Sequence, residues 1–202
     1  MNLSFLALGD SYTIGEGVLH EDRWPSRLTT RLRDEGFSFD LPHIIATTGW
    51  TTTDLKEAIR NHNLKPDYDL VSLLIGVNNQ YRGWPVSDYE NDFAELLQDA
   101  IRLSGNRPDR VLVLSIPDWG RTPFASDRNP QRISQEIDSF NQVNQHHSLK
   151  RGVHWVDVTT VTRQTPLPED WTTDDGLHPS GILYDQWVRL VLPLIINQLR
   201  TS

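Results

Sequence analysis

Residues Leu3-Ser4-Phe5-Leu6-Ala7-Leu8-Gly9-Asp10-Ser11 decide which fold this 202-residue chain is expected to adopt. The apolar run that ends at Leu8 is typical of a strand buried on both faces, as in the centre of a parallel sheet. Gly9-Asp10-Ser11 then delivers a hydroxyl group to the carboxyl edge of that sheet, where open α/β folds bind their ligands. Gly, Asp and Ser are also common in ordinary turns, so this stretch indicates a functional site only if the chain supplies chemical partners for the hydroxyl.

Suitable partners lie far downstream, in Asp175-Gly176-Leu177-His178. A serine nucleophile needs a base within hydrogen-bond reach and a group that orients the base. His178 precedes the last expected helix, whose N-terminal dipole favours the neutral imidazole that a base requires. Asp175 can orient that ring and stabilise the imidazolium formed during attack. Ser11, Asp175 and His178 are therefore the candidate catalytic residues, although on its own Asp175-Gly176 also fits a simple turn and His178 a surface position.

Four further apolar runs, in alternation with helical patterns, indicate the rest of the fold. The runs span residues 41–47, 70–75, 111–116 and 153–158, and the helical patterns begin near Trp24, Thr51, Ser87, Pro130 and Ser180. Strands that alternate with helices in this way predict a three-layer α/β/α sandwich on a five-stranded parallel sheet. We expect a single domain over residues 1–202, with loops at residues 80–85 and 159–175.

Two more residues follow strands of the predicted sheet and suit the same chemistry. Gly49 comes after the second strand and Asn78 after the third, so parallel strands bring both to the edge that carries Ser11. Acyl transfer needs hydrogen-bond donors aimed at the developing oxyanion, and each donor typically contributes ~10²–10³ in rate. The backbone N–H groups of Ser11 and Gly49 and the side-chain amide of Asn78 are the candidate donors. Taken singly, Gly49 is equally a loop glycine and Asn78 a residue that ends a strand.

Composition argues against several other classes of function. The chain has 27 acidic and 19 basic residues, and its formal net charge of −8 argues against a general nucleic-acid binder. Because there is no cysteine, disulfides, thiolate metal sites and a cysteine nucleophile are excluded. No Gly-rich loop carries the lysine of a phosphate-binding loop, and no apolar run is long enough to cross a bilayer. The first residues lack the basic region of a signal peptide, so a cytoplasmic protein is expected, while a secreted or periplasmic protein whose signal had been removed would look the same.

Together these motifs resemble those of the SGNH hydrolases, the GDSL-type esterase and lipase superfamily. Gly9-Asp10-Ser11 matches the family's nucleophile motif, and Asp175 to His178 matches its Asp-x-x-His motif. Gly49 matches its oxyanion glycine and Asn78 its oxyanion asparagine. The four motifs occur in the family's order and span almost the whole chain. The resemblance implies a flavodoxin-like α/β/α fold and ester hydrolysis through a serine acyl-enzyme on Ser11, with no metal or organic cofactor.

The chain departs from the family's pattern at two positions. Asn79 stands where the family usually has an aspartate after its oxyanion asparagine, and Tyr12 stands where it usually has a leucine after its nucleophile. In the family that aspartate is a structural partner rather than a reacting group. Asn79 is therefore expected to affect the geometry of the local loop more than the mechanism.

The expected loops carry several aromatic residues that suit substrate binding without distinguishing between two classes of substrate. The candidate substrate-binding residues are Tyr12, Trp50, Asn79, Tyr81, Trp84 and Trp119. Aromatic rings at the sheet edge could pack an acyl chain or stack on a sugar ring. We therefore expect a small-molecule substrate, either a short-chain acyl ester or an acetyl ester on a carbohydrate. No pattern in the sequence specifies an oligomeric state.

Two other functions fit the same residues. Acyl transfer to a second substrate, or thioester cleavage, would use Ser11, Asp175 and His178 in the same roles. A catalytically silent binding module would keep the fold, with Asn79 distorting the oxyanion loop. Such a module would bind its ligand but would not react with a serine-directed organophosphonate.

Overall fold

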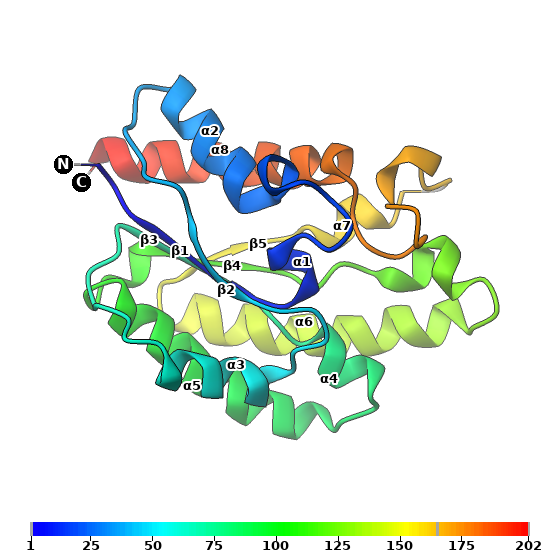
Figure 1. The fold of residues 1–202 in the computed structure, drawn as a ribbon. Coiled ribbons are helices and arrows are strands. Elements are labelled where there is room, and N and C mark those ends of the chain that lie inside the picture. The colour runs from blue at the N-terminus through cyan, green and yellow to red at the C-terminus, as the bar shows by residue number, and fades with distance from the viewer. Residues whose placement is uncertain (1, 165, 202) are drawn as a thin grey trace.

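A five-stranded parallel sheet forms the centre of the computed structural model, which describes residues 2–164 and 166–201 (Figure 1). The strands are β1 (Phe5–Gly9), β2 (His43–Ala46), β3 (Leu70–Leu74), β4 (Val111–Leu114) and β5 (His154–Val156). Their order across the sheet is β2-β1-β3-β4-β5, and each neighbouring pair is parallel. The second strand lies on one side of β1, and β3, β4 and β5 follow in order on the other side. In open α/β sheets, the point at which the order reverses is where ligands bind.

Helices cover both faces of this sheet, as expected for three layers (Figure 1). One face carries α2 (Trp24–Asp34) and α8 (Gly181–Thr201), and the other carries α3 (Thr52–Asn61), α5 (Val86–Leu103) and α6 (Pro130–Lys150). Each helix turns an apolar side toward the sheet, as Phe93, Leu96 and Leu97 of α5 do. The predicted α/β/α sandwich is therefore confirmed.

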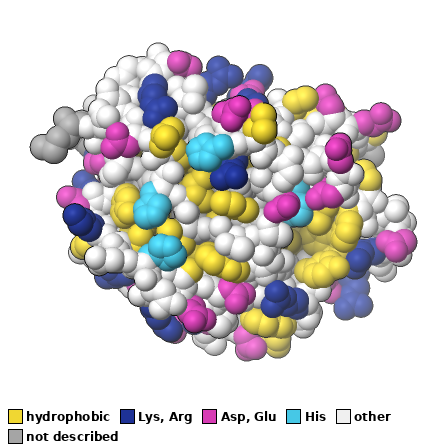
Figure 2. Space-filling view, viewed as in Figure 1, with side chains coloured by type: hydrophobic (Ala, Val, Ile, Leu, Met, Phe, Trp, Pro, Cys, Tyr) yellow, Lys and Arg dark blue, Asp and Glu magenta, His cyan; other side chains and the backbone are white. Residues whose placement is uncertain are grey.

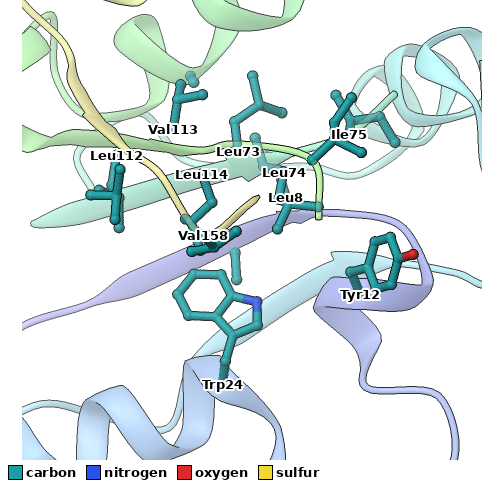
Figure 3. Close-up of a cluster of buried hydrophobic side chains, with 14 of the residues drawn as sticks. Leu8, Tyr12, Trp24, Leu73, Leu74, Ile75, Leu112, Val113, Leu114 and Val158 are labelled. Carbon is teal, nitrogen blue, oxygen red and sulfur yellow. The ribbon is translucent and has the colours of Figure 1, made fainter. Parts of the chain in front are cut away.

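The core lies between these layers and is continuous through the sheet. All residues of β1, β3 and β4 are buried, which explains why their sequences are apolar on both faces. Figure 3 shows Trp24 of α2 reaching the sheet beside Val158, with Leu8 and Leu114 close by. Since both faces are packed, every parallel strand is fixed in register, and so are the residues that follow its carboxyl end.

Several segments expected as loops contain short helices. These are α1 (Ser11–Ile14), α4 (Val77–Tyr81) and α7 (Thr159–Thr162), with 3₁₀ turns η1 (His20–Asp22), η2 (Pro108–Arg110), η3 (Trp119–Arg121), η4 (Pro123–Ala125) and η5 (Glu169–Trp171). Single helical turns bury too few residues to leave a periodic pattern in the sequence. Within residues 2–164 and 166–201, none of the helices is both long and apolar enough to span a membrane.

Candidate active site

The ends of three neighbouring strands and the loop before α8 meet at one pocket of about 220 Å³. Its lining residues are Ser11, Tyr12, Thr48, Gly49, Val77, Asn78, Tyr81, Trp119, Phe124, Leu177 and His178. Figure 2 shows hydrophobic side chains gathered beside a histidine on the right of the view, the side toward which the strands run. The pocket thus lies at the carboxyl edge of the sheet, where β1, β2 and β3 adjoin.

Ser11 is held at the start of α1, directly after β1. The side chain of Asp10 caps this short helix by accepting a hydrogen bond from the Tyr12 N–H at 3.0 Å. Gly9 permits the tight turn, because a Cβ atom there would lie 2.2 Å from Thr13 Oγ1. Ser11 is buried apart from its small surface in the pocket, being 4% exposed. The motif therefore fixes the position of one hydroxyl group at the floor of the pocket.

Asp10 itself is fully buried and does not line the pocket. Burial raises the pKa of its carboxyl to about 7, against hydrogen bonds from the backbone that lower it. Among the described residues no hydrogen-bond partner contacts its Oδ2 atom. Near neutral pH this carboxyl is consequently shared between its protonated and charged forms.

His178 and Asp175 form a close pair at the mouth of the pocket. The Nδ1 atom of His178 lies 2.6 Å from Asp175 Oδ2. The other oxygen, Oδ1, accepts bonds from the N–H groups of Leu177 at 2.8 Å and His178 at 3.0 Å, and from Thr173 Oγ1 at 2.9 Å. Because every donor to Asp175 comes from the same short loop, the carboxylate fixes both the loop and the imidazole ring.

The charge of Asp175 determines the tautomer of His178. Burial alone would raise the pKa of Asp175, but the hydrogen bonds from His178, Leu177 and Thr173 outweigh burial and hold that pKa well below its usual range. An ionised carboxylate can only accept hydrogen bonds, so the Nδ1 atom of His178 carries the proton. The Nε2 atom of a neutral ring is then free to accept a proton. The Tyr12 ring packs edge-on against the imidazole, with 5.9 Å between ring centroids.

Gly49 and Asn78 line the side of the pocket formed by the ends of β2 and β3. Gly49 has φ 84°, and a Cβ atom there would meet nothing within 4 Å, so the backbone conformation and not lack of space favours glycine. Its carbonyl oxygen accepts a bond from Arg82 Nη2 at 2.9 Å. Asn78 Nδ2 donates to the Trp50 carbonyl at 2.9 Å, which uses one of its two N–H bonds. These two bonds fasten the segment after β2 to the segment after β3.

Asn79 is fully buried and does not line the pocket. Its Oδ1 atom accepts a bond from the Thr52 N–H at 3.1 Å, and its Nδ2 atom donates to Thr52 Oγ1 at 2.8 Å. The Thr52 hydroxyl in turn donates to Asp92 Oδ2 at 2.7 Å. Asn79 therefore joins α4 to the first residue of α3, whose side chain binds a carboxylate on α5.

The predicted substrate-binding residues divide into two groups. Tyr12, Tyr81 and Trp119 line the pocket, whereas Trp50, Asn79 and Trp84 do not. Four lining residues were not anticipated from the sequence, namely Thr48, Val77, Phe124 and Leu177. Thr48, Val77 and Leu177 each adjoin a motif residue in the chain, and that adjacency could have identified them. Phe124 had no such signal, since its loop has no recognisable motif.

Comparisons with known proteins identify the family of this chain and match its fold. A model of the GDSL-like lipase/acylhydrolase family matches residues 7–185. Comparison with curated proteins finds no match. Among solved structures, TesA superposes with a TM-score of 0.75 at 19% identity, covering 96% of this chain and 99% of that chain. A lipase/acylhydrolase from Enterococcus faecalis gives a TM-score of 0.73 at 21% identity, covering 98% and 96%.

A third similar structure carries a described inhibitor. It is the psychrotrophic esterase EstA from Pseudoalteromonas sp., inhibited by monoethylphosphonate, with a TM-score of 0.66 at 15% identity, covering 99% of this chain and 98% of that chain. At such low identities these likenesses concern the fold. The family match covers the motifs at Ser11, Gly49, Asn78 and His178, all of which lie within residues 7–185.

Proposed function

The chain belongs to the GDSL-like lipase/acylhydrolase family, and on that premise we propose that it is a serine esterase acting on carboxylic esters. One observation carries the proposal: Ser11 and His178 line the same pocket, and Asp175 holds the imidazole at 2.6 Å through Nδ1. A hydroxyl, a base with its free nitrogen available and an orienting carboxylate are the groups that acyl transfer requires.

In the proposed reaction, Ser11 Oγ attacks the ester carbonyl carbon while His178 Nε2 accepts the hydroxyl proton. The carbonyl oxygen becomes an oxyanion, for which the N–H groups of Ser11 and Gly49 and the amide of Asn78 are the proposed donors. His178 then gives its proton to the departing alcohol, leaving an acyl group on Ser11. A water molecule, deprotonated by His178, hydrolyses this acyl-enzyme and restores the hydroxyl. Asp175 stabilises the imidazolium at each transfer.

Pocket size and lining favour a small acyl group. The pocket of about 220 Å³ is smaller than the ~300–1,000 Å³ typical of sites for drug-sized ligands. Its wall includes the side chains of Val77, Tyr81, Trp119, Phe124 and Leu177. We therefore propose short-chain acyl or acetyl esters as substrates, the alcohol being either a simple one or a sugar.

Hydrolysis of p-nitrophenyl acetate and butyrate by the wild type and by Ser11→Ala tests the proposal. We expect turnover by the wild type and a rate near background for Ser11→Ala, because the members of a catalytic triad act as a unit. A phosphonate ester should label the wild type and not Ser11→Ala, as judged by intact-protein mass. An inactive, unlabelled wild type, or a variant as fast as the wild type, would contradict the assignment.

A further inference from the structure

Arg128 contacts three aromatic rings of the pocket wall at once. Its guanidinium carbon lies 5.0 Å from the ring centroid of Phe124, 5.3 Å from that of Tyr81 and 5.5 Å from that of Trp119. The rings also contact one another, with centroids 5.5 Å apart for Tyr81 and Trp119 and 6.1 Å apart for Trp119 and Phe124. Arg128 does not line the pocket, so it supports this wall from outside.

The three rings differ in how firmly the rest of the protein holds them. Trp119 is buried, and its indole N–H donates to Gln80 Oε1 at 2.7 Å. Tyr81 is 49% exposed, and its hydroxyl takes a bond of 3.3 Å from Arg128 Nη2. Phe124 is half-buried, on the short turn η4. Removing Arg128 therefore frees the side chains of Tyr81 and Phe124 first, while Trp119 stays in place.

We propose that Arg128 is a specificity-determining residue: its guanidinium fixes the positions of Tyr81 and Phe124 and so restricts the pocket to short acyl chains. The inference rests on the proposed esterase function. A flat, delocalised cation can stack on several ring faces, which a lysine ammonium does less well. Asp127 is largely exposed and lies 3.9 Å from Arg128, so their ion pair is weak. The guanidinium's other contacts are with the three rings and the Tyr81 hydroxyl.

The test compares acyl-chain profiles. kcat/KM is measured for p-nitrophenyl butyrate and octanoate with the wild type, Arg128→Ala, Arg128→Lys and Arg102→Ala. Arg102 is a matched control, because it is a similarly exposed arginine that pairs with Asp99 on α5. We expect the octanoate-to-butyrate ratio to rise about fivefold in Arg128→Ala, the scale of one lost cation–π contact, and less in Arg128→Lys. The ratio for Arg102→Ala should equal that of the wild type.

Each other outcome has a definite meaning. An active Arg128→Ala variant whose ratio matches the wild type overturns the inference and leaves the esterase function intact. A wild type that hydrolyses neither ester overturns the proposed function, and the inference with it. Hydrolysis of the p-nitrophenyl monoester of succinic acid tests whether Arg128 instead binds an anionic acyl group. A selective loss of this activity in Arg128→Ala, with an unchanged octanoate-to-butyrate ratio, would overturn the inference in favour of that role.

Discussion

Asn79 forms hydrogen bonds with both the N–H group and the hydroxyl oxygen of Thr52. An aspartate at the same position could not donate to that oxygen. The Asn79 amide donates to the Thr52 oxygen, which leaves the hydroxyl proton for Asp92. An aspartate would supply no donor, and two carboxylates would then compete for one proton. Asp92 also binds the ammonium group of Lys56, so the carboxylate of this network resides on α5. Asn79, which departs from the family's pattern, is thus matched by the carboxylate of Asp92 on another helix.

This arrangement predicts the effect of Asn79→Asp. We expect a loss of about 1–3 kcal/mol in the free energy of unfolding, the usual cost of an unsatisfied buried polar group. The double substitution Asn79→Asp/Asp92→Asn returns one donor and one acceptor to Thr52, so its cost should be smaller than the sum of the two single costs. Urea unfolding of the four proteins measures the coupling, and strictly additive costs would contradict the network.

Asp10 predicts a pH-dependent stability. The pKa of its carboxyl is about 7 in the folded chain and an ordinary carboxyl value, near 3.8, in the unfolded chain. Its raised value favours folding at low pH, and that contribution is lost as the pH rises from about 4 to about 7, at about 1.4 kcal/mol per pKa unit. The stability advantage of Asp10→Asn over the wild type should therefore be larger at about pH 8 than at about pH 5.

Denaturant unfolding at the two pH values measures this difference. Asp109→Asn, which alters an exposed carboxylate, is the control and should follow the wild type at both values. Parallel pH profiles for the wild type and Asp10→Asn would show that Asp10 is ionised in the folded protein throughout.

At the scale of elements, the turn after β2 depends on the left-handed conformation of Gly49. Gly36, at the end of α2, has φ 91° and also has open space around a Cβ position, but it lies outside the pocket lining. Alanine at either glycine should cost about 1–2 kcal/mol of stability through backbone strain. Only Gly49→Ala should also lower esterase kcat, because it alone moves a proposed oxyanion donor. Equal kcat values for the two variants would contradict that role.

The elements that sequence predicts well are those whose pattern is long. Leu70 to Ile75 is apolar at nearly every position, so β3 and its place at the sheet centre are predictable. Asn78 could then be placed beside Ser11 because parallel strands end at one edge, and both residues do line the pocket. Helix α4 has only five residues, too few for a pattern that the sequence could reveal. Ser87, the predicted start of the next helix, lies inside α5, which begins at Val86 after Pro85.

The direction of side chains in loops was not predictable. Trp50 and Trp119 both follow strands, in segments without a periodic sequence pattern, yet only Trp119 lines the pocket. The orientation of Trp119 depends on its hydrogen bond to Gln80 and its edge-on contact with Tyr81, both distant in sequence, and on the guanidinium of Arg128 later in the same loop. No local pattern encodes such contacts, because they form only after the strands have assembled.

For the whole molecule, we propose that residues 1–202 fold as one domain. A single cluster of buried side chains runs from β1 through α8, and α2 of the first half packs beside α8 at the other end of the chain (Figure 1). Calorimetric unfolding should therefore show one transition whose calorimetric and van't Hoff enthalpies agree. Two resolved transitions, or a calorimetric enthalpy well above the van't Hoff value, would contradict a single cooperative unit.

The loop that carries the base is tied to the wall of the pocket. The Phe124 N–H donates to the Gly176 carbonyl at 3.0 Å, between Asp175 and His178 in the chain. A substitution that moves Phe124 to admit a bulkier ester therefore also pulls on the histidine loop. For the proposed esterase, this bond would couple substrate range to turnover, so directed evolution toward larger esters would meet an activity trade-off unless a second change re-anchors residues 175–178.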